Sequence, residues 1–213
     1  MTSQRLLVLG ASLLALAACD NPAPSRLKPE SIPLAARPAP PPSVSALVWD
    51  AATSRFSLDG KALKTVKLWS FDGSTDGFVL TGGEALPMAG PGLKLTNQIR
   101  DPALRSPKGL ALEGAKGNLV IVRLTRTKVG GAWDGTLFYS TASHPEAAGF
   151  RAVAYLGGNP PLNQVTTLAY DMNALAEGGS DWTSSLIDQI RLDTDDDIGG
   201  SFIVHQIAVV QKP

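Results

Sequence analysis

The 213-residue sequence contains a single cysteine, Cys19, and only two histidines, His144 and His205. One cysteine cannot form an intrachain disulfide, so the stability of the domain must come from its core. The sequence also contains no Gly-x-Ser-x-Gly or His-Glu-x-x-His pattern and no glycine-rich phosphate loop. We therefore expect no enzyme and no catalytic residues, although a carboxylate pair suited to glycoside hydrolysis would leave no recognisable spacing.

Excess charge of either sign is absent as well. Nineteen Lys and Arg residues balance 19 Asp and Glu residues, and the formal net charge is +0. Without a basic face or a block of like charge, nothing in the sequence predicts binding to nucleic acid or to anionic lipid headgroups. After the first 18 residues, no apolar run approaches the roughly 20 residues of a membrane-spanning helix.

The first 19 residues have the organisation of a signal peptide. Arg5 supplies a positive charge, residues 6–15 are apolar, and Leu16-Ala17-Ala18-Cys19 closes the segment. This ending resembles the lipobox of bacterial lipoproteins. The resemblance implies a signal peptide at residues 1–18, cleavage before Cys19, and lipidation of Cys19. An ordinary signal peptide or an N-terminal membrane anchor is the alternative interpretation.

Asp20, directly after the cysteine, resembles the signal that retains some lipoproteins in the inner membrane. We therefore expect a lipid-anchored protein of the bacterial cell envelope that faces the periplasm, with the inner membrane preferred over the outer membrane. Residues 19–43 are rich in proline and alanine. Proline favours the extended polyproline II conformation, so this linker would reach roughly 60 to 70 Å at full stretch. A docking motif for a groove on another protein is the alternative.

Residues 44–213 form the expected folded domain, and their pattern predicts strands. Short runs rich in β-branched and aromatic residues alternate with glycine pairs, and no ten-residue stretch has a helical period. We expect one helical turn at residues 173–177, and Asp59-Gly60 predicts a hairpin. An all-β sandwich or barrel accounts for this pattern. The expected strands cover residues 67–71, 77–80, 92–96, 118–124, 136–140, 150–156, 164–170, 186–192 and 201–209.

Several fragments along the domain share their order with one family. They are residues 68–78, 101–107, 137–141 and 190–193, followed by a final strand that contains Phe202. In this order they resemble the galactose-binding-like jelly rolls that are related to carbohydrate-binding modules. The resemblance implies a two-sheet antiparallel jelly-roll β-sandwich, a non-catalytic role, and binding of a glycan or polysaccharide at a concave face or at edge loops.

The last strand departs from the family pattern. Such modules often end in Phe-x-Ile-Asp-Trp-Ile, whose aspartate helps to hold calcium, whereas this chain has Phe202-Ile203-Val204-His205-Gln206-Ile207. Imidazole is a poor calcium ligand, so the usual calcium site is in doubt. A structural calcium remains a hypothesis for the aspartates that could supply oxygen ligands, with a solvated acidic turn as the alternative. These residues are Asp72, Asp76, Asp193, Asp195 and Asp197.

Sugar rings are commonly recognised by aromatic faces and by charged hydrogen-bond donors. We therefore select Trp133, Tyr139 and Tyr155, which are placed in a loop or alternate with apolar neighbours, and Arg123 and Arg151, which interrupt apolar strands. The alternative is that these side chains belong to the core or scaffold, as we expect for Trp69, Phe71, Phe138 and Phe202. A second hypothesis for the whole protein is an adaptor lipoprotein that contacts a protein partner of an envelope or export assembly.

Overall fold

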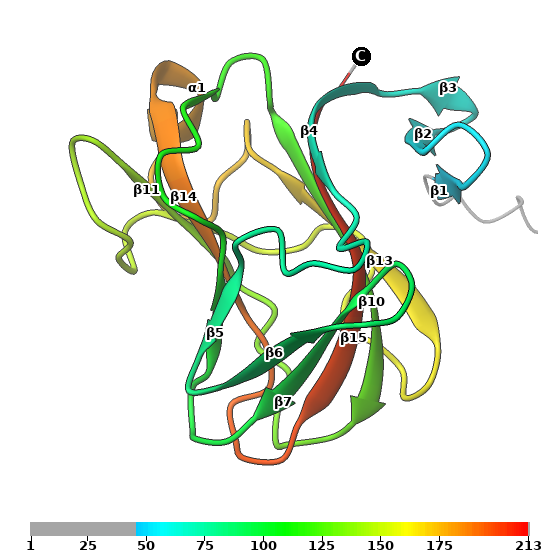
Figure 1. Ribbon diagram of the computed structural model, residues 1–213. Helices are drawn as coiled ribbons and strands as arrows, with labels where there is room; N and C mark the ends of the chain where they lie inside the picture. Colours follow the sequence, from blue (N-terminus) through cyan, green and yellow to red (C-terminus); the bar gives the residue numbers. More distant parts are fainter. Residues whose placement is uncertain (1–45, 213) are drawn as a thin grey trace, which may run out of the picture. The chain divides into compact units, whose positions relative to one another are not determined.

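The computed structural model describes residues 46–212 and contains three antiparallel sheets (Figure 1). In this part of the chain the single helix is α1 (Asp181–Ser184), which is too short to cross a membrane. The predicted signal peptide, Cys19 and the proline-rich linker lie outside the described residues.

Two six-stranded sheets, called sheet I and sheet II, form the body of the domain. The strand order of sheet I is β13 (Val165–Asp171), β10 (Leu119–Lys128), β15 (Ser201–Gln211), β7 (Leu93–Asn97) and β6 (Gly83–Pro87), and β4 (Lys64–Trp69) also pairs with β15. The strand order of sheet II is β12 (Arg151–Ala152), β11 (Leu137–Thr141), β14 (Leu186–Asp193), β8 (Ala103–Arg105) and β5 (Val79–Thr81), and β9 (Leu112–Glu113) pairs with β14.

The inner faces of sheets I and II share one hydrophobic core. Val122 and Phe202 of sheet I and Leu104 and Ile190 of sheet II are among its buried members. Side chains alternate between the two faces of a strand, so each sheet contributes every second residue to this core. The protein is therefore an all-β sandwich, and the predicted fold class is confirmed.

A small third sheet, called the cap, precedes the sandwich strands. It contains β1 (Leu47–Asp50), β2 (Arg55–Leu58) and β3 (Lys61–Ala62). The hairpin predicted at Asp59-Gly60 is present, and both residues have positive φ, 51° and 78°. Positive φ at both central residues is the conformation of a tight two-residue hairpin turn.

The cap covers part of the outer face of sheet I. Phe56 and Leu63 form a second buried cluster with outward-facing residues of sheet I, among them Leu119, Ile121 and Ala208. At this end sheet I is therefore buried on both faces. This explains why Leu119-Val120-Ile121-Val122 is continuously apolar instead of alternating.

Three expectations about local structure are wrong. Residues 173–177 form no helix, and the helical turn lies at Asp181–Ser184. Only Arg151–Ala152 of the strand expected at 150–156 is paired as a strand. Phe138 is not a core residue, because it is partly exposed between Arg151 and Arg191 on the outer face of sheet II, with the Arg191 guanidinium 4.8 Å from its ring centre.

Candidate ligand-binding face

The outer face of sheet I changes from apolar to polar side chains where the cap ends. Along β10 the outward positions are Leu119 and Ile121, which the cap covers, and then Arg123 and Thr125, which are only partly buried. Polar side chains at this level also come from the two neighbouring strands. We call the set the polar patch, and it consists of Arg123, Thr125, Thr167, His205 and Gln206.

A β-bulge in β15 assembles the patch. Arg123 is paired with Gln206, but the next residue of β10, Leu124, is paired with Val204, so His205 is an additional residue without a partner in the register. Because Val204 and Ile207 both belong to the inner core, His205 and Gln206 lie consecutively on the outer side. A bulge commonly re-aims side chains in this way.

Hydrogen bonds fix the patch side chains in place. Nη1 of Arg123 donates to Oε1 of Gln206 over 3.1 Å, and Oγ1 of Thr125 lies 2.9 Å from Nε2 of His205. On the opposite strand, Thr167 is the direct neighbour of Arg123. The patch therefore combines hydroxyl, amide, imidazole and guanidinium groups on one rigid sheet surface.

Partial burial affects both ionisable groups of the patch. Burial lowers the pKa of Arg123, and it lowers the pKa of His205, to which the positive charge of Arg123 adds a smaller effect in the same direction. His205 is therefore neutral at pH 7, since a histidine with an ordinary pKa near 6.5 is already mostly neutral there.

The lowered pKa of His205 predicts a loss of stability in acid. The unfolded chain binds a proton near pH 6.5, before the folded chain does, so unfolding becomes easier as pH falls from 7 through the folded-state pKa. One group contributes a slope of at most about 1.4 kcal/mol per pH unit. Urea denaturation between pH 7 and pH 5 should show a shallower pH dependence for His205→Gln than for the wild type. Equal slopes would contradict the depressed pKa.

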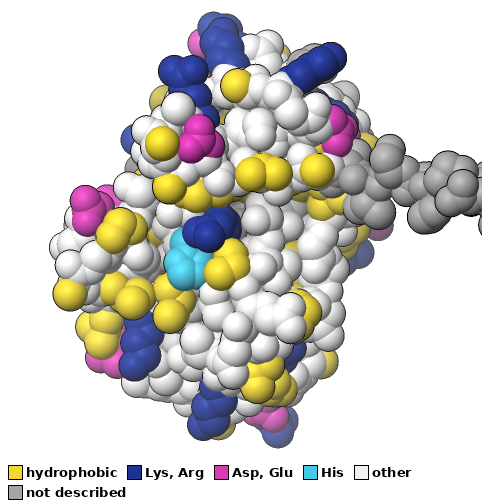
Figure 2. Space-filling view, turned by 90° about the vertical axis from the view of Figure 1, so that its right-hand side faces the viewer, with side chains coloured by type: hydrophobic (Ala, Val, Ile, Leu, Met, Phe, Trp, Pro, Cys, Tyr) yellow, Lys and Arg dark blue, Asp and Glu magenta, His cyan; other side chains and the backbone are white. Residues whose placement is uncertain are grey.

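Figure 2 looks at the molecule from this side. It shows one histidine side chain near the middle of the face, next to a Lys or Arg side chain, with hydrophobic side chains around them. Ile203 and Val165 are both paired with Thr125 across the strands, and Lys94 is paired with Ile203. Because neighbouring pairs share a face, these residues border the patch.

The five residues selected from the sequence do not gather in one place. Arg123 lies in the polar patch. Trp133 is partly buried at another edge, where its ring packs 5.7 Å from Phe202 and its backbone bridges to Asp195. An outward orientation of Tyr139 is wrong, because its side chain is 0% exposed and its hydroxyl donates to Asp181.

Tyr155 and Arg151 are partly exposed, but they lie away from the patch. The Tyr155 ring is 44% exposed and lies beneath the Lys212 ammonium, 5.5 Å from it. Arg151 lies in β12, at the edge of sheet II, and faces Glu177 at 4.0 Å. Both residues are available to solvent, and neither contributes to the polar patch.

Sequence reasoning missed Thr125, Thr167, His205 and Gln206 as members of one surface. A signal was present, because the two consecutive polar residues His205-Gln206 interrupt an apolar strand and indicate a bulge. The other histidine, His144, has a structural role. It stacks on Phe150 at 3.5 Å, and its Nε2 lies 2.9 Å from Asp181.

The five aspartates considered for calcium do not converge on one site. Between residues 46 and 212, no group of three or more His, Cys, Asp or Glu side chains could hold a metal ion. Asp76 accepts hydrogen bonds from the Phe71 amide and from Ser74, and Asp72 is exposed. Each of the alternating aspartates instead has an arginine partner. The pairs are Asp193 with Arg191, Asp195 with Arg126, and Asp197 with Arg100.

The Arg126–Asp195 pair is the most buried of the three. Its side chains are 6% and 0% exposed, and Nη2 of Arg126 lies 2.7 Å from Oδ1 of Asp195. Oδ2 of Asp195 also accepts a hydrogen bond from the Gly130 amide over 2.6 Å. The turn that contains Asp195 and Asp197 is thus held in place by the Arg126 guanidinium.

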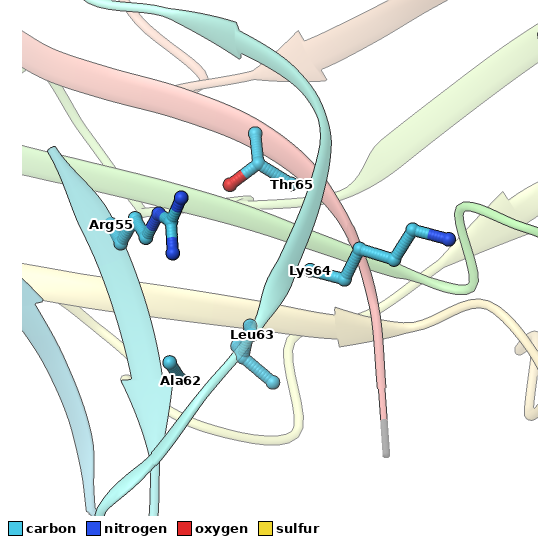
Figure 3. A pocket seen from close by; sticks show the side chains of 5 residues that line it. All are labelled: Arg55, Ala62, Leu63, Lys64 and Thr65. Carbon is cyan, nitrogen blue, oxygen red and sulfur yellow. The ribbon is translucent and has the colours of Figure 1, made fainter.

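Two surface hollows lie outside the patch. One has a volume of about 360 Å³ and is lined by Arg55 of the cap and by the segment from Ala62 to Thr65 that leads into β4. Figure 3 shows the Arg55 side chain reaching toward this segment. The other hollow, of about 350 Å³, includes Lys67, Ser70 and Asp76. Neither hollow contains a residue of the polar patch.

No protein-family model matches this chain, and no curated protein is similar to it in sequence. Solved structures with a related fold include the xylan-binding module CBM86 from Roseburia intestinalis, with 14% identity over 68% of this chain and 95% of the module and a TM-score of 0.44. The C-terminal family 22 carbohydrate-binding module of Clostridium thermocellum Xyn10B has 20% identity over 69% and 94%, with a TM-score of 0.43. A carbohydrate esterase of bacteriophage phi24B has 15% identity over 71% and 100%, with a TM-score of 0.44. These likenesses concern the general fold and do not indicate what this chain binds.

Proposed function

We propose that this protein is a non-catalytic lipoprotein of the bacterial envelope whose β-sandwich binds a glycan or polysaccharide through the polar patch. The observation that carries the proposal is Arg123. It is a partly buried guanidinium on an open sheet face, oriented by Gln206 and surrounded by further hydrogen-bonding groups.

The chemistry of the patch suits a sugar. Sugar hydroxyls both donate and accept hydrogen bonds, and the patch offers donors from Arg123 together with hydroxyl and imidazole groups that can do either, while the buried Gln206 amide orients Arg123. Apolar side chains beside the polar groups, such as Ile203 and Val165, can contact the C–H faces of sugar rings. A few fixed polar groups within a partly apolar surface are typical of ligand sites.

The membrane anchor is part of the same proposal and rests on the sequence. Lipidation of Cys19 would attach the chain to the membrane, and the proline-rich residues 19–43 would hold the sandwich away from the lipid headgroups. A polysaccharide near the envelope surface would then be within reach of the patch.

Affinity electrophoresis of the full-length protein on a panel of neutral and acidic polysaccharides tests the proposal. We expect Arg123→Ala to weaken binding by about 10- to 100-fold, the usual effect of losing hydrogen bonds from a charged donor. Thr167→Trp, which places a bulky ring beside Arg123, should weaken the same interaction without removing the guanidinium.

Arg151→Ala is the matched control. It removes another partly buried arginine, from the edge of sheet II, so affinity should stay within about twofold of the wild type. Binding that Arg151→Ala abolishes and Arg123→Ala leaves intact would contradict the assigned face. If no polysaccharide binds while an envelope protein is retained through the patch, the adaptor hypothesis replaces the glycan hypothesis.

A further inference from the structure

The polar patch has an unusual charge environment. The partly or fully buried arginines between residues 46 and 212 are Arg105, Arg123, Arg126, Arg151 and Arg191. Four of them form ion pairs with Glu146, Asp195, Glu177 and Asp193, respectively, whereas Arg123 has none. Its side-chain hydrogen bond goes to the neutral amide of Gln206. Partly buried charges are normally paired with an opposite charge, so Arg123 is suited to pair with a negatively charged group of a ligand.

The surroundings of Arg123 supply no negative charge. Its neighbours across the strands are Thr167 and Gln206, and the nearby ionisable group is His205, which is neutral at pH 7. The next charged residue across this part of the sheet is another cation, Lys94. It is exposed and follows Ile203 in the row that starts at Thr125. The patch is therefore locally positive although the whole chain has no net charge.

The geometry of the two cations favours an extended anionic ligand. Arg123 lies on β10 and Lys94 on β7, with β15 between them. Two strand spacings correspond to about 10 Å, and Lys94 is displaced along the strands by two further residues, or about 7 Å, so the cations can contact separate charged groups of one chain. Gln206 engages only Nη1 of Arg123 in the described structure, and a guanidinium presents a planar donor edge that matches a carboxylate.

We infer that the ligand of the polar patch is an acidic polysaccharide whose carboxylates, those of uronic acid residues, pair with Arg123 and with Lys94. This inference rests on the proposed glycan-binding function and specifies the class of its ligand. Sugar hydroxyls would still bind the partly exposed Thr125 and Thr167, and the carboxylate would pair with Arg123.

Uronate polymers compared with their methyl esters provide the test, because esterification removes the charge and keeps the sugar. Polygalacturonate, polymannuronate and hyaluronan, each with its methyl ester, are titrated into the full-length protein by isothermal titration calorimetry. We expect at least one acid form to bind about tenfold or more tightly than its ester, and salt to weaken that binding.

Variants of Arg123 and Lys94 test whether these two cations cause the preference for the acid form over the ester. Arg123→Gln should reduce the preference for the acid form to about twofold or less, and Arg123→Lys should keep part of it, because charge remains without the planar edge. Lys94→Gln should reduce the preference by less than Arg123→Gln. Lys128→Gln changes an exposed lysine further along β10 and should have no effect within about twofold.

The possible failures can be distinguished. If esters and acids bind equally and Arg123→Ala abolishes both, the uronate inference is overturned and the glycan function stands. If dextran sulfate binds more tightly than every uronate, the carboxylate assignment is overturned in favour of sulfate. If a neutral polysaccharide binds through Arg123 and no uronate binds, the uronate inference is overturned and the glycan function stands. If no polysaccharide of the electrophoresis panel or of the uronate series binds, or if binding is unaffected by Arg123→Ala, the proposed function itself fails.

Discussion

Replacing Asp195 by alanine should lower the free energy of unfolding by about 3 to 5 kcal/mol, since it leaves a buried guanidinium without its counter-ion. Arg126 is 5% exposed, and its remaining partners are the Asn159 side chain and the Gly131 carbonyl, neither of which carries a negative charge. The change also removes the acceptor of the Gly130 amide. Thermal and urea denaturation measure the effect, which corresponds to a drop of roughly 6 to 20 °C in Tm for a domain of this size.

Asp197→Ala is the matched control, because Asp197 lies in the same acidic turn. Its arginine partner is 81% exposed, so the loss should be within about 1 kcal/mol. The double variant Arg126→Met/Asp195→Asn removes both charges and retains an acceptor for Gly130, so it should be more stable than Asp195→Ala. A loss below about 1 kcal/mol for Asp195→Ala would contradict a desolvated ion pair at this position.

Phe56→Ala should lower the free energy of unfolding by a similar amount and should release the cap from sheet I. The Phe56 side chain is 1% exposed, its ring centre lies 4.8 Å from that of Trp49, and it packs with Leu119, Ile121 and Ala208. Removing a buried phenylalanine typically costs about 3 to 5 kcal/mol. Urea denaturation gives the loss, and hydrogen exchange should show faster exchange of the Leu63 amide, which donates to the Phe56 carbonyl.

Val48→Ala controls for general effects on the cap, because Val48 lies in the same small sheet and is 53% exposed. It should change stability by no more than about 0.5 kcal/mol. If Phe56→Ala leaves both the stability and the Leu63 exchange rate unchanged, the cap does not depend on this contact with sheet I.

Local patterns were sufficient to predict the sandwich strands and the hairpin at Asp59-Gly60. Eight of the nine expected runs overlap substantially with strands of the structure, from β4 to β15. The run at 150–156 does not form one continuous strand. Its first two residues pair as β12, Val153 and Ala154 are unpaired, and Leu156 forms only an isolated bridge with Ala169. The strand β8 at Ala103–Arg105 follows Pro102 and is too short to produce a period-2 pattern.

The location of the candidate site could not be predicted from the sequence, because it depends on strand register and on a bulge. Arg123 could be selected because it interrupts an apolar strand, but the partners that orient it come from β13 and from the end of the chain. Their meeting requires the register of three strands and the bulge at His205. For Tyr139 the local alternation could not show that its ring is buried next to the loop that contains His144, whose ring centre lies 5.6 Å away.

The most direct test of the account is to map a bound glycan by NMR. The isotope-labelled full-length protein is titrated with fragments of the polysaccharide that it binds most tightly in affinity electrophoresis. We expect the largest amide shifts at Arg123, Thr125, Thr167, His205 and Gln206, and small shifts on sheet II. Shifts centred on Arg151 and Phe138 of sheet II, or no shifts at saturating glycan, would contradict the claim that the open half of sheet I is a glycan-binding face.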